Sequence, residues 1–152
     1  LFEIESIKSV PKEAQAGWWD MEWWWNQPNV PEVVAFVADF RKAVNATPTA
    51  RHWFGYVAVQ TVRLAAEKAK SLEGPKLSMA LEDLELPPEI ALQPGKIRYR
   101  AGDHQLMSNI FVGQVHPPTD NPDNVFTVAQ LVTGEQADGS VEDTGCKMVH
   151  PA

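Results

Sequence analysis

The sequence predicts a mixed α/β fold whose sheet is incomplete within this chain. From about residue 31 to residue 84, apolar residues recur at helical spacing, which indicates three helices. From about residue 96 to residue 132, β-branched and aromatic residues form short runs, which indicates strands. Three helices and a few strands do not form a sheet covered on both faces, as a doubly wound domain requires. We therefore expect further strands from outside these residues.

The composition is that of a folded, acidic protein. Hydrophobic residues make up 44% of the 152 residues, and 20 acidic against 13 basic residues give a formal net charge of −7. This balance disfavours nucleic acids as partners, because phosphates would be repelled. Cys146 is the single cysteine, so no disulfide can form within the chain. The chain begins at Leu1 without a signal peptide, and we expect it to be a fragment of a longer protein.

The first thirty residues contain a short alternating run and a cluster of tryptophans. Residues 1–7 alternate between apolar and acidic side chains, which predicts a short strand. Residues 17–25 read GWWDMEWWW and hold five of the six tryptophans. This cluster could line an aromatic or sugar ligand, pack between lobes, or form an interface exposed by truncation. We favour packing, because five tryptophans carry too much apolar area to leave in water.

Helical periodicity is clearest in the middle of the chain. Residues 31–44 form the first predicted helix, with a proline in its first turn. The second helix runs from about residue 50 to residue 71, with Thr49 as a suitable N-cap. Its first half is apolar nearly all round, which indicates burial. A short third helix is predicted by Leu77, Ala80, Leu81 and Leu84.

The last third changes to strand patterns and then to a polar tail. Strands are predicted at 96–100, 110–115 and 125–132, and the linker HPPTDNPDN between the last two favours turns. From Gly134 the sequence is polar and acidic, which predicts a poorly ordered tail. We divide the chain into a hinge-proximal segment with the tryptophan cluster (1–30), an α/β part (31–132) and the tail (133–152).

Three sequence blocks follow one another in the middle of the chain. The first is PTARHWFGYVAVQTVRLAAEKA, in which Pro48 precedes the pattern Tyr56-x-Ala58-x-Gln60. The second is KLSMALEDLEL and the third is KIRYRAGDHQLMSNIFVGQV. In this order the blocks resemble the type I periplasmic solute-binding proteins of branched-chain amino acid and aromatic acid ABC transporters. This resemblance spans roughly residues 30–116. It implies the C-terminal portion of a two-lobed fold with three-layer α/β/α lobes, since chains of this family are more than twice as long.

The resemblance also implies a function. A protein of this family captures a small ligand between two lobes that close on it, without covalent chemistry. Tyr56 matches a cleft aromatic of the family, and Trp53 and His52, one turn earlier, are further ligand-binding candidates; Tyr56 could equally be a core aromatic. The implied partners are an amino acid or aromatic acid, the membrane permease of an ABC transporter and a missing N-terminal lobe. The implied location is the periplasm, and no cofactor is implied. Exposed edges and apolar faces could also make the fragment self-associate.

Two other functions remain open from the residues. The tryptophan cluster could serve a stand-alone carbohydrate- or protein-interaction module. An enzyme is a weaker hypothesis: Asp103 and His104 are neighbours but no nucleophile motif accompanies them, and we expect them to organise a turn. The four histidines and Cys146 lack the spacing of a metal site. We expect no catalytic residue and no metal.

Overall fold

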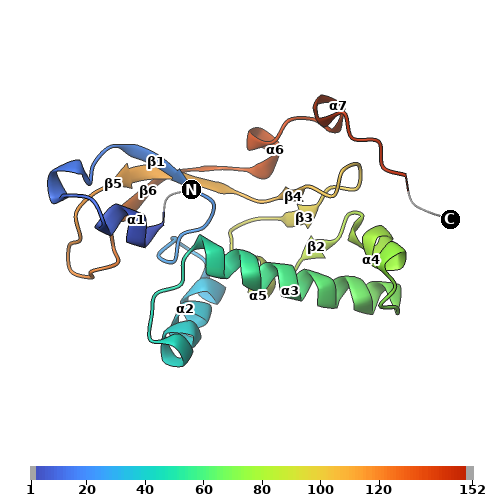
Figure 1. Ribbon diagram of the computed structural model, residues 1–152, viewed down its shortest axis with the longest axis horizontal. Helices are drawn as coiled ribbons and strands as arrows, with labels where there is room; N and C mark the ends of the chain where they lie inside the picture. The colour runs from blue at the N-terminus through green and yellow to red at the C-terminus, as the bar shows by residue number, and fades with distance from the viewer. Residues whose placement is uncertain (1–2, 150–152) are drawn as a thin grey trace.

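The computed structural model describes residues 3–149, with long helices along one side of the molecule and two small sheets along the other (Figure 1). Both sheets have three strands, in the orders β1-β5-β6 and β2-β3-β4. Every strand pair is antiparallel. The mixed α/β class is as predicted, with strand β1 lying ahead of the main helices in the chain.

The two long helices form where periodicity predicts them. Helix α2 spans Pro31–Val44 and ends at Asn45, whose φ of 55° turns the chain out of the helix. Helix α3 spans Ala50–Ala69, begins with a capping box at Thr49 and ends at Lys70, whose φ is 50°. The capping box satisfies backbone N–H groups that the first turn leaves without intrahelical partners.

The short elements between and after these helices complete one half of the molecule, the helical half. They are helix α4, strand β2, helix α5, strand β3 and strand β4, at Gly74–Leu81, Glu85–Leu86, Pro88–Ala91, Ile97–Tyr99 and Leu106–Met107. Helix α4 starts and ends about three residues earlier than its apolar spacing predicts. Its last expected member, Leu84, lies buried in the following turn.

The other half, the strand half, is assembled from three separate parts of the sequence. They are helix α1 (Ile4–Lys8), strand β1 (Trp18–Met21) and the hairpin of β5 (Ile110–Val115) with β6 (Phe126–Val132). A single-turn 3-10 helix, η1 (Lys12–Ala14), links α1 to β1. In β5–β6 the register shifts between Val112 and Gly113.

The strand predicted at residues 1–7 is wrong for its described part, which is helix α1. Ile4 and Ile7 are both buried, and their spacing of three places them on one helical face. The alternation rested largely on Phe2, which lies outside the described residues. An alternation of so few residues does not distinguish a strand from one helical turn.

Each half has its own hydrophobic core, and consecutive tryptophans belong to different cores. Trp23 lies in the core of the helical half with Trp53 and Ile97. Trp24 lies in the core of the strand half with Phe111. Trp25 packs partly against both cores, Trp19 is half-buried and Trp18 is exposed. Most of the tryptophan cluster is therefore packed inside the molecule, as the favoured interpretation requires. That this packing joins two lobes stays a prediction.

The segment expected to be a poorly ordered tail forms two short helices, α6 (Gly134–Ala137) and α7 (Val141–Thr144). Each begins with a capping box, at Thr133 and at Ser140. Local caps of this kind order a polar segment without a periodic apolar stripe. The three-part division of the chain at residues 30 and 132 stays a prediction.

Candidate functional site

A hollow of about 400 Å³ lies at the boundary between the two halves. We call it the boundary hollow. From the strand half it is lined by α1, the residue after it and the β5–β6 linker, and from the helical half by the loop between α2 and α3. The lining residues are Ile4, Glu5, Lys8, Ser9, Ala46, Thr47 and Asp123.

A chain of polar contacts joins the halves across the boundary hollow. Asp123 accepts a 2.8 Å hydrogen bond from Lys8 Nζ within the strand half. Its other carboxylate oxygen accepts a 2.7 Å hydrogen bond from the Thr47 hydroxyl of the helical half. The Thr47 oxygen in turn accepts from Arg41 Nε and Nη2, at 3.2 and 3.0 Å. One cation, Lys8, thus contacts the carboxylate directly, and a second, Arg41, is linked to it through the Thr47 hydroxyl.

This arrangement keeps Asp123 ionised. Burial by itself would raise the pKa of Asp123, but the hydrogen bonds from Lys8 and Thr47 and the charges of Lys8 and Arg41 outweigh it, so the pKa is lowered. Trp25 fixes the backbone here, because its indole N–H donates to the Asp123 carbonyl at 3.1 Å. The Arg41 guanidinium lies 4.5 Å from the centre of the Trp25 ring, a cation–π distance.

A second carboxylate, Glu3, is buried beside the start of α3. Its side chain is only 7% exposed, and Arg51 Nε lies 3.5 Å from one of its oxygens. Burial raises the pKa of Glu3, with the hydrogen bond from Thr49 and the charge of Arg51 opposing that rise. Glu3 therefore forms a second polar link between the halves.

The three residues that the sequence singled out for ligand binding lie on the first two turns of α3. His52 is exposed, accepts a hydrogen bond from the Thr49 backbone N–H at 3.1 Å and packs against Phe40. Trp53 is fully buried and donates from Nε1 to the Ala91 carbonyl at 2.9 Å. Tyr56 is half-buried, and its hydroxyl donates to the Glu89 carbonyl at 3.1 Å.

These three residues lie on one helix but do not line the boundary hollow. Their ligand-binding role stays a prediction. Sequence reasoning missed Lys8, Thr47 and Asp123, which come together from three regions; Lys8 and Asp123 are 115 positions apart. Asp123 lies in a linker whose composition indicates only turns, so no local pattern marks it.

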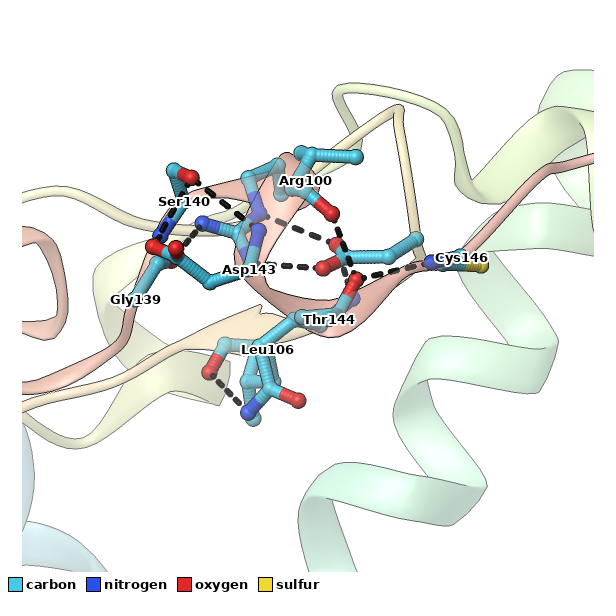
Figure 2. A network of polar contacts seen from close by, with 10 residues as sticks. Arg100, Leu106, Gly139, Ser140, Asp143, Thr144 and Cys146 are labelled. Carbon is cyan, nitrogen blue, oxygen red and sulfur yellow. Dashed lines mark hydrogen bonds and ion pairs between the residues drawn. The ribbon is translucent and has the colours of Figure 1, made fainter.

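A separate polar network organises the turn between β3 and β4. Arg100 donates from Nε and Nη2 to both carboxylate oxygens of Asp103, at 2.9 and 2.5 Å. Its Nη1 donates to the Gly139 carbonyl at 2.7 Å, which holds the segment between α6 and α7 (Figure 2). The hydrogen bond from Arg100 lowers the pKa of Asp103. Asp103 and His104 thus organise a turn, as predicted; His104 has a φ of 56°.

The described residues, 3–149, contain no group of three histidine, cysteine or acidic side chains placed to hold a metal ion. Across the same residues, no helix is long and apolar enough to cross a membrane.

A family model described as "Periplasmic binding protein" matches residues 1–121. No curated protein matches the chain.

The solved structures that are similar to this one include the following three. A periplasmic binding protein from Burkholderia mallei has a TM-score of 0.81 at 19% identity, over 96% of this chain and 38% of that chain. An ABC-type branched-chain amino acid transporter protein from Rhodopseudomonas palustris has a TM-score of 0.68 at 25% identity, over 82% and 33%. A solute-binding protein of an ABC transporter from R. palustris BisB5, in complex with 3,4-dihydroxybenzoic acid, has a TM-score of 0.71 at 17% identity, over 87% and 35%.

The chain therefore spans little more than a third of the length of these solved proteins. Their likeness confirms the fold class that the sequence resemblance implied.

Proposed function

This chain belongs to the periplasmic binding protein family, and from that premise we propose that it is part of the solute-binding component of an ABC transporter. The component would capture an amino-acid-like or aromatic-acid ligand outside the cytoplasm, in the periplasm, and deliver it to a membrane permease. Binding would proceed by closure of two bodies on the ligand, with no covalent chemistry. The observation that carries the proposal is the boundary hollow between two separate cores.

The boundary hollow offers both charges of an amino acid a partner. Lys8 and Arg41 would attract a ligand carboxylate, and Asp123 would attract an ammonium group. These groups now satisfy one another across the hollow, so a ligand would take over contacts that the halves make directly. An aromatic acid would use the cations and leave Asp123 with Thr47.

The residues implied by the family resemblance enter the proposal in different roles. His52 is exposed and Tyr56 is half-buried, so both are accessible to a ligand that extends beyond the boundary hollow, which neither of them lines. Trp53 is fully enclosed, and we propose that it supports the other two from beneath. Tyr56 would lend its hydroxyl to the ligand at the expense of its bond to the Glu89 carbonyl.

The proposal includes a partner that completes the fold, the missing N-terminal lobe. Helix α3 buries Trp53, Val57, Thr61 and Ala65 on one side. On the other side Val59 and Val62 are 70% and 56% exposed, beside a shallow groove. A helix that is apolar on both sides is typical of one covered on both sides. The same exposed face would drive self-association of the isolated chain.

A thermal-shift screen of the 152-residue chain against amino acids and aromatic acids tests the function. A true ligand at about 100 times its Kd should add roughly 2.7 kcal/mol of stability, which is a shift of several degrees. Asp123→Asn should weaken the binding of amino acids more than the binding of aromatic acids, because it removes the charge that would face an ammonium group. Glu142→Gln, on exposed α7, is the control of equal charge change. No shift with any member of the panel would contradict the proposal.

A further inference from the structure

The chain passes between its two halves at three places. Residues 22–30 lead from β1 to α2, and residues 108 and 109 lead from β4 to β5. Thr133 leads from β6 to α6, whose Gly134 lies against Met107 of β4 in the helical half. Two of these crossings lie side by side, because Ile110 at the start of β5 pairs with Val132 at the end of β6. The backbone at a crossing has few ladder partners, so its N–H and C=O groups need other ones.

Two buried amide side chains supply those partners. Gln93, after α5, is 2% exposed, and Asn109, in the second crossing, is 4% exposed. Gln93 Nε2 donates to the Glu22 carbonyl in the first crossing at 2.7 Å and to the Asn109 carbonyl at 3.3 Å. The Asn109 backbone N–H returns a 2.8 Å bond to Gln93 Oε1, and Asn109 Nδ2 donates to the Pro94 carbonyl at 2.7 Å.

Neighbouring side chains extend the same hydrogen-bond network into the helical half. Trp23 Nε1 donates to the Leu92 carbonyl at 2.8 Å, and Gln27 Nε2 donates to the same carbonyl at 3.1 Å. Leu92 has a φ of 49°, so the chain turns sharply where these bonds converge. Both ends of the first crossing are therefore tied to one short loop, residues 92–94, of the helical half.

We propose that Gln93 and Asn109 are the pivot about which the two halves turn, and that they set the orientation in which the boundary hollow can close. This inference rests on the proposed function only in that ligand capture gives the turning of the halves its purpose. A hinge needs a fixed point beside residues that absorb the backbone change. The amide pair fixes that point, because breaking it would leave several buried polar atoms without partners. Gln93 and Asn109 are positioning residues, since neither lines the boundary hollow.

The pivot is distinct from the contacts that join the halves across the hollow. Lys8, Asp123, Thr47 and Arg41 join the halves through half-exposed side chains that a ligand or water can replace. The amide pair is nearly inaccessible, so water cannot replace its bonds without local unfolding. Loss of the pivot should therefore disorder the relative placement of the halves, whereas loss of the Asp123 contacts should only open the hollow.

The test uses the 152-residue chain with Cys146→Ser and one spin label on each half, at Ala38→Cys on α2 and Ala129→Cys on β6, both exposed positions. Double electron–electron resonance measures the distribution of distances between the labels. Gln93→Ala should broaden this distribution at least about twofold, with helical circular dichroism retained. Gln15→Ala is the matched control: Gln15 is a buried glutamine of the strand half whose Nε2 bonds to the Val10 carbonyl, away from any crossing.

An unchanged distribution in folded Gln93→Ala would overturn the proposal. Equal broadening by Gln15→Ala would also overturn it, because general destabilisation would then explain the effect. If Gln93→Ala does not fold, Asn109→Ser decides; it keeps the backbone bond to Gln93 and removes the one to the Pro94 carbonyl. Broadening by Asn109→Ser supports the pivot, and no broadening contradicts it. Ligand is absent throughout, so the result does not depend on whether the chain binds a solute.

Discussion

The helical half and the strand half reach a buried core by different routes. The helical half is built from one nearly continuous stretch, from α2 through β4, whose long helices are capped and terminated locally. The strand half gathers α1 and β1 from the start of the chain and the β5–β6 hairpin from about ninety residues later. One half is specified mainly by periodicity and the other mainly by long-range pairing. The difference indicates two bodies joined by crossings, which is what ligand capture by closure requires.

The consecutive residues Trp23 and Trp24 test the comparison most strongly, because each belongs to a different core. Trp23→Ala and Trp24→Ala should each lower the free energy of unfolding by about 3–5 kcal/mol. Trp23→Ala should be the costlier, since it also leaves the Leu92 carbonyl with one donor fewer. Urea unfolding followed by circular dichroism measures both. Trp18→Ala, at a 62% exposed position, should change stability by less than about 0.5 kcal/mol. If Trp24→Ala changed the free energy of unfolding as little as Trp18→Ala, the strand half would have no core of its own.

Two glycines, one in each half, should give the next largest changes in stability when they are substituted. Gly113 lies in β5 at the register shift, where a Cβ atom would collide with the Thr127 carbonyl oxygen and the Phe126 ring. Gly113→Ala should therefore destabilise by roughly 1–3 kcal/mol. Gly55 lies in α3 with open space around a Cβ, so Gly55→Ala should stabilise by about 0.5–1 kcal/mol. Thermal unfolding of the two variants should show shifts of opposite sign. Shifts of the same sign would contradict this packing of the hairpin.

The two carboxylates at the boundary should respond to pH in opposite ways. The pKa of Glu3 is raised by burial, so its contribution to stability is present below about pH 4.3, the ordinary glutamate value, and is lost as the pH rises through its folded value. The pKa of Asp123 is lowered, so its contribution is present above about pH 3.9 and is lost as the pH falls through its folded value.

Urea unfolding across that acid range should show this difference. Glu3→Gln should gain stability relative to the parent chain as the pH rises towards 7, because a buried charge is removed. Asp123→Asn should lose stability at neutral pH, by about 1 kcal/mol or somewhat more, because hydrogen bonds to a charged group are weakened. Parallel pH profiles for the two variants would mean that these carboxylates do not face different environments.

The sequence predicted the helical half well because its information is local. Proline at the start of α2, Thr49 before α3 and apolar repeats in between define both helices without tertiary contacts. The family resemblance placed these helices in the correct fold class. The strand half was harder: one turn of helix at Ile4 and Ile7 was mistaken for a strand, since so short a segment carries no decisive period.

The candidate site could not be found from local patterns. Lys8, Thr47 and Asp123 form it only because strand pairing brings the β5–β6 linker beside α1. No local sequence pattern marks the pivot residues either, because Gln93 and Asn109 do not differ in the sequence from ordinary loop amides. Their roles depend on burial at the crossings of the chain. The tail was misjudged for a related reason, since Arg100 holds it from a distant turn.

One measurement bears most directly on the claim that solute binds between two bodies that close on it. The same spin-label pair, Ala38→Cys with Ala129→Cys, would be examined without ligand and with the amino acid that gives the largest thermal shift. The account predicts a narrower and shifted distance distribution with that amino acid, and no such change in Asp123→Asn at the same concentration. A ligand that stabilises the chain while leaving the distance distribution unchanged would contradict it.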